Sequence, residues 1–317
     1  MTLIREDKIL CDRKETLVEA LMRSFSFVST LESAQSFIDK KCLFINDNLI
    51  TEDQSVKEGD IIILTTSQDQ EPSVDLSYEI IFKDEYILVI NKSGNLPVHP
   101  AGKYFFNTLQ AKLERDGFGK LDPAHRVDRE TSGIVIFAKS KDVLVKLHHA
   151  FAKQRINKSY LALTFGIPEP KKGEINKPLL KTTVGELRDF MVCDERGKPA
   201  KTEYEVLESS GDFAFVKITL DHGRRHQIRV HLAFIAHPIV GDKLYGRYPE
   251  LFIRSYQNDK NVAKDILQNL LSERQLLHAY QSELLHPISK EILSFNAKLP
   301  NDFSSFLEKN SFHTVFQ

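Results

Sequence analysis

Cysteine is scarce in this chain of 317 residues, and the three cysteines that occur are far apart. Cys11, Cys42 and Cys193 form no C-x-x-C pair. Disulfide frameworks use even numbers of cysteines, and structural zinc sites use closely paired ones. The sequence therefore predicts neither a disulfide-stabilised domain nor a structural zinc site, and it fits the reducing cytosol.

Long apolar runs are also missing. No run reaches the roughly 18 apolar residues of a membrane-spanning helix, and the start MTLIREDKIL lacks the basic-then-apolar layout of a signal peptide. With 41% hydrophobic and 27% charged residues, the composition is that of a soluble globular protein. We therefore expect a cytoplasmic protein with no membrane partner.

A strong charge of either sign is missing as well, since the formal net charge is −1. The charges are nevertheless segregated: residues 46–85 hold eleven acidic and two basic side chains, whereas residues 139–158 hold six basic and one acidic. Clustered Lys and Arg bind phosphates, but a like-charge run is often only a solvated face. Both interpretations of residues 139–158 stay open at this point.

The first part of the chain has the pattern of a small binding module. Ser29 and Glu32 have the spacing of a capping box and precede apolar residues at helical spacing. An earlier helix is predicted around residues 16–22, and strands around residues 43–45 and 61–64. Units of about sixty residues are usually binding modules rather than independent enzymes.

Two helices followed by KKCLFINDN and a later KEGDIII resemble the alpha-L RNA-binding fold, which occurs in a small-subunit ribosomal protein and in many RNA-modifying enzymes. The resemblance covers residues 12–65 and implies that Arg23, Lys40 and Lys41 face RNA phosphates. A solvated helix end is the alternative for these cations. The sequence departs from the family where Lys41 or Cys42 stands in place of a common glycine.

A polar linker at residues 66–77, which contains Pro72, separates this module from a second domain at residues 78–317. Because strands outnumber helices there and several are joined by short turns, we expect an α+β fold on a mostly antiparallel mixed sheet. The predicted strands are 86–92, 133–139, 158–166 and 213–220, and the predicted helices are 140–156, 226–235 and 262–273.

One stretch of the second domain concentrates charge at the start of an apolar strand. HRVDRETSGIVIFAK, residues 125–139, places Asp128 between Arg126 and Arg129. Cationic neighbours favour the ionised carboxylate, and partial burial strips water from it. Such a carboxylate is either a member of a structural ion pair or a nucleophile. The stretch alone leaves both roles open.

The string H-R-V-D-R-E-T-S-G closely resembles the signature of the RluA-type pseudouridine synthases, usually H-R-L-D-R-x-T-S-G. Four later segments resemble further motifs of that family in the same order, and five ordered motifs are not expected by chance. These segments are KSYLA at 158–162, GRRHQIRVHL at 223–232, HPIVGDKLYG at 237–246 and LLHAYQSELLHP at 276–287.

The resemblance implies that uridine in RNA is isomerised to pseudouridine: the glycosidic bond breaks, the base turns, and carbon 5 rejoins the sugar. By motif position Asp128 is the nucleophile, Tyr160 stacks on the uracil and assists proton transfer, and Arg229 pairs with the carboxylate. An adduct with the sugar, an adduct with the base and a glycal route all stay open. No redox step or group transfer occurs, which implies no cofactor, and the sequence has no P-loop or dinucleotide fingerprint.

The resemblance also implies a set of RNA contacts. Arg126 is the candidate for gripping the flipped nucleotide, since a uridine must leave its stack to be modified. Lys158 extends a basic helix that offers phosphate contacts, with Arg224 and Arg225 opposite and Arg129 beside the nucleophile. Arg225 replaces the family's usual Thr. Large-subunit ribosomal RNA is the expected substrate, tRNA is the alternative, and a monomer is implied.

Three other functions have partial support in the sequence. His222, His226 and His231 suggest zinc, but a zincin needs Glu at position 223, where Gly stands, so hydrogen-bonding histidines and no metal are expected. The kinase H-R-D loop is excluded because H-R-V-D has one residue more and no D-F-G follows. A ribosome-assembly factor with little activity remains as the alternative, and the intact Asp128 weighs against it.

Overall fold

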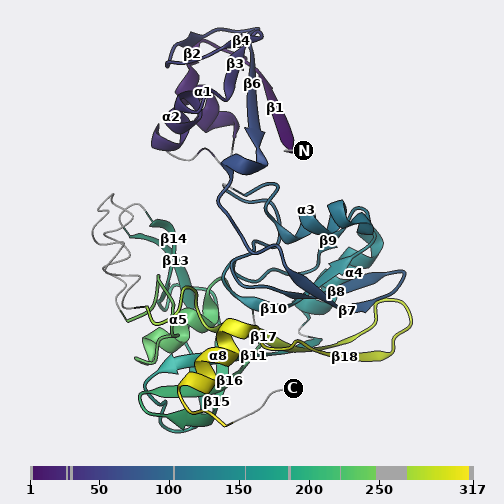
Figure 1. The fold of residues 1–317 in the computed structure, drawn as a ribbon, viewed down its shortest axis with the longest axis vertical. Helices are drawn as coiled ribbons and strands as arrows, with labels where there is room; N and C mark the ends of the chain where they lie inside the picture. The colour runs from purple at the N-terminus through teal and green to yellow at the C-terminus, as the bar shows by residue number, and fades with distance from the viewer. Residues whose placement is uncertain are drawn as a thin grey trace. The chain divides into compact units, whose positions relative to one another are not determined.

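The computed structural model describes residues 3–25, 28, 31–102, 104–153, 155–184, 187–221, 223–247 and 270–313 (Figure 1). The chain divides into two compact units. The first consists of Met1–Val74 with His99–Gly117, and the second of Asp75–Val98 with Phe118–Gln317. Ser29, His222 and most of the helix predicted at 262–273 lie outside the described residues.

The first unit is built on a four-stranded sheet in the order β1-β6-β3-β4, in which all pairs are antiparallel. Both helices and both strands predicted near its start are confirmed. The strand β1 was not predicted, because four consecutive charged residues interrupt its apolar pattern. The elements are β1 (Ile4–Leu10), β2 (Glu15–Thr16), α1 (Leu17–Ser24), α2 (Leu31–Asp39), β3 (Leu43–Ile45), β4 (Asn48–Leu49), β5 (Ser55–Val56), β6 (Ile61–Ser67), a 3-10 turn (Gln68–Gln70) and α3 (Leu109–Leu113), which a π-turn (Glu114–Phe118) follows.

Two helix ends of the first unit have identifiable caps, the start of α1 and the end of α2. Thr16 and Glu19 form a capping box at the start of α1. At the end of α2, the amides of Lys41 and Cys42 donate to the carbonyls of Ile38 and Phe37, and Lys41 has φ 57°. This is a Schellman motif, whose left-handed position favours glycine. The departure from the alpha-L pattern therefore falls on a residue whose side chain brings backbone strain.

The second unit contains a ten-stranded sheet whose main order is β12-β15-β16-β11-β17-β10-β8-β7, with β18 paired to β17 and β9 to β10. Among the described strands of this sheet, β10–β17 is parallel and the other pairs are antiparallel, which confirms the predicted fold class. The strands are β7 (Tyr78–Lys83), β8 (Ile87–Lys92), β9 (Asp122–Pro123), β10 (Ser132–Ala138), β11 (Ile156–Phe165), β12 (Lys172–Asn176), β15 (Lys201–Ser210), β16 (Phe213–Leu220), β17 (Leu277–Leu285) and β18 (Ile292–Asn296).

Helices cover both faces of this sheet (Figure 1). Along β11, Tyr160 and Ala162 pack with α4 (Lys141–Ala152) and α5 (Gln227–Phe234). The alternate residues Leu161 and Leu163 pack with α8 (Asn301–Lys309) instead, because successive side chains of a strand point to opposite faces. A separate hairpin, β13 (Leu179–Val184) with β14 (Leu187–Cys193), lies beside α5. The helices predicted at 140–156 and 226–235 are confirmed with shorter bounds.

Candidate active site

Three adjacent strands of the second unit bring the predicted catalytic segment and Tyr160 together. Gly133, near the start of β10, pairs with Ala279 of β17, and Ala279 pairs on its other side with Tyr160 of β11. Asp128 lies in the loop that leads into β10, where its carbonyl accepts the amide of Thr131 and closes a tight turn. The parallel pairing of β10 and β17 therefore fixes how this loop leaves the sheet.

The carboxylate of Asp128 is paired with a distant residue rather than with its arginine neighbours. Oδ2 accepts Nη1 of Arg229 at 2.8 Å, across 101 positions of sequence. The Asp128 side chain keeps 27% of its surface exposed, whereas that of Arg229 keeps 9%. Burial is the largest single influence and would raise the pKa of Asp128, but the electrostatic influence of Arg229 and His226 and the hydrogen bonds from Arg229 and Gln275 together hold that pKa below its ordinary value. The result is an ionised carboxylate at the edge of a buried site.

Arg229 has a second acidic partner that the sequence motifs did not reveal. Its Nε and Nη2 donate to the two oxygens of Asp242 at 2.7 and 2.9 Å. The Asp242 carboxylate also accepts the amides of Leu244 and Tyr245, and only 2% of the residue is exposed. This geometry fixes the guanidinium plane. Asp242 lies within the HPIVGDKLYG motif, but the motif gave no indication of its partner.

Tyr160 is buried on the same face of the sheet, with 8% of its surface exposed. Burial, reinforced by the negative charge of Asp128, raises the pKa of Tyr160 to about 12. Its hydroxyl is therefore protonated at neutral pH and lies within the electrostatic influence of the Asp128 carboxylate. The structure thus brings the three predicted catalytic residues Asp128, Tyr160 and Arg229 into one neighbourhood.

Two buried basic side chains hold the Asp128 loop by its backbone. Nζ of Lys92, a residue with 1% exposure, donates to the carbonyl of Arg129 at 3.1 Å, and burial lowers its pKa well below the ordinary value. Nη1 of Arg274 donates to the carbonyl of Glu130 at 2.9 Å, while its Nε and Nη2 donate to Asp302 at the start of α8. Neither residue was predicted, because only the fold brings them near their partners, which are backbone carbonyls and the Asp302 carboxylate.

Two further side chains approach the carboxylate of Asp128. Nε2 of Gln275 donates to Oγ1 of Thr131 at 2.8 Å and lies 3.4 Å from Oδ2 of Asp128. Nε2 of His226 lies 3.8 Å from Oδ1 of Asp128. Gln275 directly precedes the LLHAYQ segment, so its position next to a recognisable motif was the available signal. His226 was expected to hydrogen-bond without a stated partner.

The predicted RNA-binding arginines of the second unit lie around this site with different exposures. Arg126, Arg129 and Arg225 are exposed, and Arg129 pairs with Glu130 at 3.0 Å. Arg224 is half-buried, and its Nε donates to a backbone carbonyl at 3.1 Å. The charge of Arg225 contributes to lowering the pKa of His226, which indicates that it lies near the site.

Lys158 precedes Tyr160 on β11 and points toward α4. Its Nζ lies 5.1 Å from the ring centre of Phe151, and burial lowers its pKa. A partly desolvated ammonium binds an anion more strongly than an exposed one does. The solvent-facing side of α4 and the residues that follow it add the exposed cations Lys141, Lys146, Lys153 and Arg155.

The predicted RNA-binding residues of the first unit also differ in whether their charge is exposed or paired with carboxylates. Lys40 and Lys41 are exposed at the end of α2, whereas Arg23 pairs with Asp12 at 3.0 Å and with Glu15 at 2.5 Å. Its charge is thus largely balanced by carboxylates. The cationic end of α2 is the better candidate for phosphate contacts.

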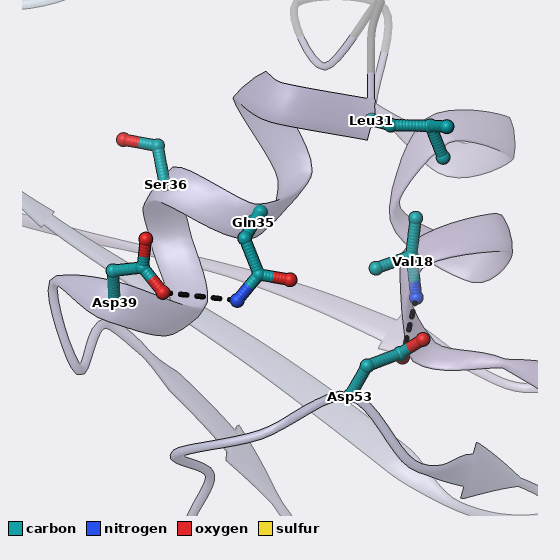
Figure 2. Close-up of a pocket in the computed structure, with 6 residues that line it drawn as sticks. All are labelled: Val18, Leu31, Gln35, Ser36, Asp39 and Asp53. Atoms are coloured by element: carbon teal, nitrogen blue, oxygen red, sulfur yellow. Dashed lines mark hydrogen bonds between the residues drawn. The ribbon is translucent and has the colours of Figure 1, made fainter.

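A cavity of about 500 Å³ lies between α1 and α2 (Figure 2). Oδ1 of Asp53 accepts the amide of Val18, and Oδ1 of Asp39 accepts Nε2 of Gln35. The residues that line it carry two carboxylates and no cation: Val18, Leu31, Gln35, Ser36, Asp39 and Asp53. This cavity is therefore unsuited to phosphate.

The part of the chain that the structure describes contains no group of three or more His, Cys, Asp and Glu side chains that could hold a metal ion. His231, one of the three histidines considered for zinc, instead hydrogen-bonds Oγ1 of Thr202 at 2.7 Å and the carbonyl of Lys177 at 2.9 Å. None of the described helices is both long and apolar enough to span a membrane.

Comparison with known proteins gives consistent matches. The family model for RNA pseudouridylate synthase matches residues 86–234. The ribosomal large subunit pseudouridine synthase D of Zymomonas mobilis is 35% identical over 237 residues, which are 72% of this chain and 71% of that protein. The synthase D of Pasteurella multocida is 32% identical over 284 residues, covering 86% of this chain and 85% of that protein.

A solved structure agrees with these sequence matches. The human RNA Pseudouridylate Synthase Domain Containing 1 has a TM-score of 0.59 at 26% identity, and the match covers 78% of this chain and 93% of that one. The ion pair of Asp128 and Arg229 lies within a fold that these proteins share. The chain therefore belongs to the RNA pseudouridylate synthase family, and it is an isomerase that acts on uridine in RNA.

Proposed function

We propose that this chain isomerises specific uridines of large-subunit ribosomal RNA to pseudouridine, with Asp128 as the nucleophile and with the target base flipped out of its stack. The observation that carries the proposal is the carboxylate of Asp128, which is ionised by the buried Arg229 yet 27% exposed to solvent. Two relatives with 35% and 32% identity are named as large-subunit synthases, which supports the choice of RNA.

The chemistry requires a different contribution from each residue. Asp128 supplies an anion that attacks the sugar or the base, or that removes a sugar proton on a glycal route, and all three routes need it ionised. Arg229 preserves that charge without giving its own proton to the carboxylate, because the pKa of Arg229 is raised despite its burial. Tyr160 offers a flat ring and a protonated hydroxyl, and stacking a base on such a ring contributes about 1–3 kcal/mol.

A flipped uridine also needs its backbone held. Arg126 lies two positions before the nucleophile and is exposed, so we assign it to the flipped nucleotide. The basic side of α4, together with Lys158, Arg224 and Arg225, would contact the flanking phosphates. Lys40 and Lys41 of the first unit would add further phosphate contacts, as the alpha-L resemblance implies.

The enzyme is further proposed to work in the cytosol as a monomer and to need no cofactor. The alternative substrate is tRNA.

The test is to incubate the protein with unmodified transcripts of large-subunit ribosomal RNA and of tRNA, without cofactor or metal. Pseudouridines are then mapped by carbodiimide labelling and primer extension. Discrete new sites in the ribosomal transcript are expected. Sites in tRNA alone would overturn the choice of RNA, and the absence of sites in either would favour an assembly factor with little activity.

A further inference from the structure

His226 lies near the carboxylate oxygen of Asp128 that Arg229 does not contact. Its Nε2 lies 3.8 Å from Oδ1 of Asp128, whereas Arg229 and Gln275 approach Oδ2. The His226 side chain is 12% exposed and directly precedes α5, which carries Arg229. The two oxygens of the carboxylate therefore have different neighbours. His226 lies near Oδ1, which does not contact Arg229.

A hydrogen-bonded chain behind His226 determines where its ring proton lies. The amide of Met191 on β14 donates to the hydroxyl oxygen of Tyr245 at 2.9 Å, and this oxygen lies 2.9 Å from Nδ1 of His226. With one donor already on its oxygen, the Tyr245 hydroxyl uses its own proton to bond Nδ1. Nδ1 is then an acceptor, so the ring proton lies on Nε2.

The opposite tautomer is disfavoured at both ends of this chain. A proton on Nδ1 would place two donors on the oxygen of Tyr245 and would take away the acceptor of its own hydroxyl proton. It would also turn the lone pair of Nε2 toward the anionic Oδ1 of Asp128. Both effects are costly in a buried site, where unpaired polar groups and like charges are poorly screened.

The charge state of His226 makes the tautomer relevant. Burial lowers the pKa of His226 to about 4, and the charges of Arg229 and Arg225 add to this effect, while Asp128 and Asp242 oppose it. The ring is therefore neutral at neutral pH and carries one proton only. Tyr245 is itself held in place, because its ring lies 5.0 Å from the guanidinium carbon of Arg229.

We propose that His226, held in its Nε2–H tautomer by Tyr245, is a positioning residue that directs Oδ1 of Asp128 toward the substrate. The inference rests on the proposed function of Asp128 and adds a second anchor to it. Arg229 fixes one carboxylate oxygen by a hydrogen bond of 2.8 Å. The neutral N–H of His226, at 3.8 Å from the other oxygen and beyond hydrogen-bond distance, orients that oxygen through its dipole. A neutral donor suits this task, since it orients the anion without neutralising it.

The first test measures the tautomer directly in the full-length protein. Protein labelled with ¹⁵N-histidine is studied by long-range ¹H–¹⁵N correlation, and the signals of His226 are assigned by their loss in His226→Asn. We expect the Nε2–H tautomer in the wild type and a shift toward mixed tautomers in Tyr245→Phe, which lacks the hydroxyl. An Nδ1–H tautomer in the wild type, or identical spectra for both proteins, would overturn the proposal.

The second test separates positioning from folding. His226 has φ 55°, a left-handed conformation that Asn adopts readily, so His226→Asn preserves the backbone but is too short to reach Asp128. His226→Gln places an amide N–H near the position of Nε2. We expect His226→Asn to lower the single-turnover rate about 10- to 100-fold with RNA affinity unchanged, and His226→Gln to recover a large part of the loss.

Equal rates for His226→Asn and His226→Gln would reduce His226 to a structural residue and contradict the proposal, as would a wild-type rate in His226→Asn. Failure of the proposed function has a different signature. In that case the wild type itself isomerises no uridine in either RNA, while the spectrum still reports whether Tyr245 sets the tautomer. A wild-type protein with activity and with the wrong tautomer contradicts only the inference about His226.

Discussion

At the scale of single residues, the site depends on the way in which one buried arginine is shared by two carboxylates. Arg229 contacts Asp128 at 2.8 Å and Asp242 at 2.7 Å, and the three side chains together carry one net negative charge. Asp242 is enclosed, whereas Asp128 retains some exposure. Asp242 therefore serves as the structural counter-charge, which leaves Asp128 free to face a substrate.

Replacing Asp242 tests this division of roles. Asp242→Ala leaves Arg229 with one counter-charge and leaves the amides of Leu244 and Tyr245 without an acceptor. We expect a loss of about 3–5 kcal/mol in the free energy of unfolding, because one partner of a buried pair is removed. Asp242→Asn keeps the acceptor oxygen and should lose less. Urea unfolding followed by circular dichroism measures both variants, and equal stability of Asp242→Ala and the wild type would contradict the assignment.

The three residues predicted to be catalytic were recognisable because the family resemblance assigns each of them a role by its motif position. It assigns no role to Asp242, which also lies within a motif, or to Lys92 and Arg274, since their functions depend on partners that sequence proximity does not reveal. Arg129 shows that proximity in sequence can also suggest a partner that the structure does not have. It is adjacent to Asp128 in sequence but pairs with Glu130, and the charge that stabilises Asp128 comes from α5.

At the scale of elements, the parallel contact of β10 with β17 sets the geometry of the catalytic loop. Gly133 has φ 105°, and a Cβ atom at this position would lie 2.3 Å from the carbonyl oxygen of Ala279. The T-S-G sequence at the start of β10 therefore permits a close approach of two backbones. Because Ala279 of β17 also pairs with Tyr160 of β11, the same approach brings Tyr160 near the nucleophile Asp128.

The variant Gly133→Ala should force β10 away from β17. Gly117 is a matched control, because it has φ 89° but a Cβ atom added there would have no other atom within 4 Å. The backbone conformation alone costs about 1–3 kcal/mol, so Gly117→Ala should lose that amount of stability. Gly133→Ala should lose more and should also lose isomerase activity. Comparable unfolding free energies for the two variants would show that the close approach is unimportant.

The apolar strands of the second unit were predictable because β8, β10, β11 and β16 are continuous or alternating runs of Ile, Val, Leu and Phe. The strand β1 was not, since charged residues occupy its middle and its stability comes from pairing with β6. The order of strands in the sheet was also beyond local patterns. It depends on long-range contacts, such as that of β10 with β17, across 146 positions at Ser132 and His278.

At the scale of the whole molecule, buried neutral histidines make stability depend on pH. Burial lowers the pKa of His125 to about 3 and those of His226 and His278 to about 4. An unfolded chain binds protons at these rings below pH of about 6.5, whereas the folded protein does not. The unfolded state therefore gains protons first, and stability falls as pH decreases from about 6.5 toward 4.

We expect each of these histidines to remove about 1.4 kcal/mol of stability per pH unit within that window. Urea midpoints measured at pH 7.5 and pH 5.5 should differ clearly in the wild type. His125→Gln should reduce the difference only in part, because burial also lowers the pKa of His226, His231 and His278. His149→Gln, at an exposed position on α4, should leave it unchanged. A midpoint that is independent of pH would contradict the burial of these rings in neutral form.

The exposed cations of the first unit are expected to make RNA binding more sensitive to salt. Lys40→Gln combined with Lys41→Gly removes two exposed cations, and Gly suits the φ of 57° at position 41. Stability should therefore be retained. The slope of log K against log salt should decrease by up to about 2 units, in proportion to the phosphates released. An unchanged slope in filter-binding titrations would show that this unit does not grip RNA through the end of α2.

The central claim is that Asp128 performs isomerisation, and tritium release tests it most directly. A transcript of large-subunit ribosomal RNA carrying uridine tritiated at carbon 5 is incubated with the wild type or with Asp128→Asn, without cofactor. We predict tritium release by the wild type alone, with RNA affinity equal within about threefold in both proteins, since Asn nearly matches Asp in shape and lacks only the charge. Release by Asp128→Asn at the wild-type rate would contradict the assignment of the nucleophile.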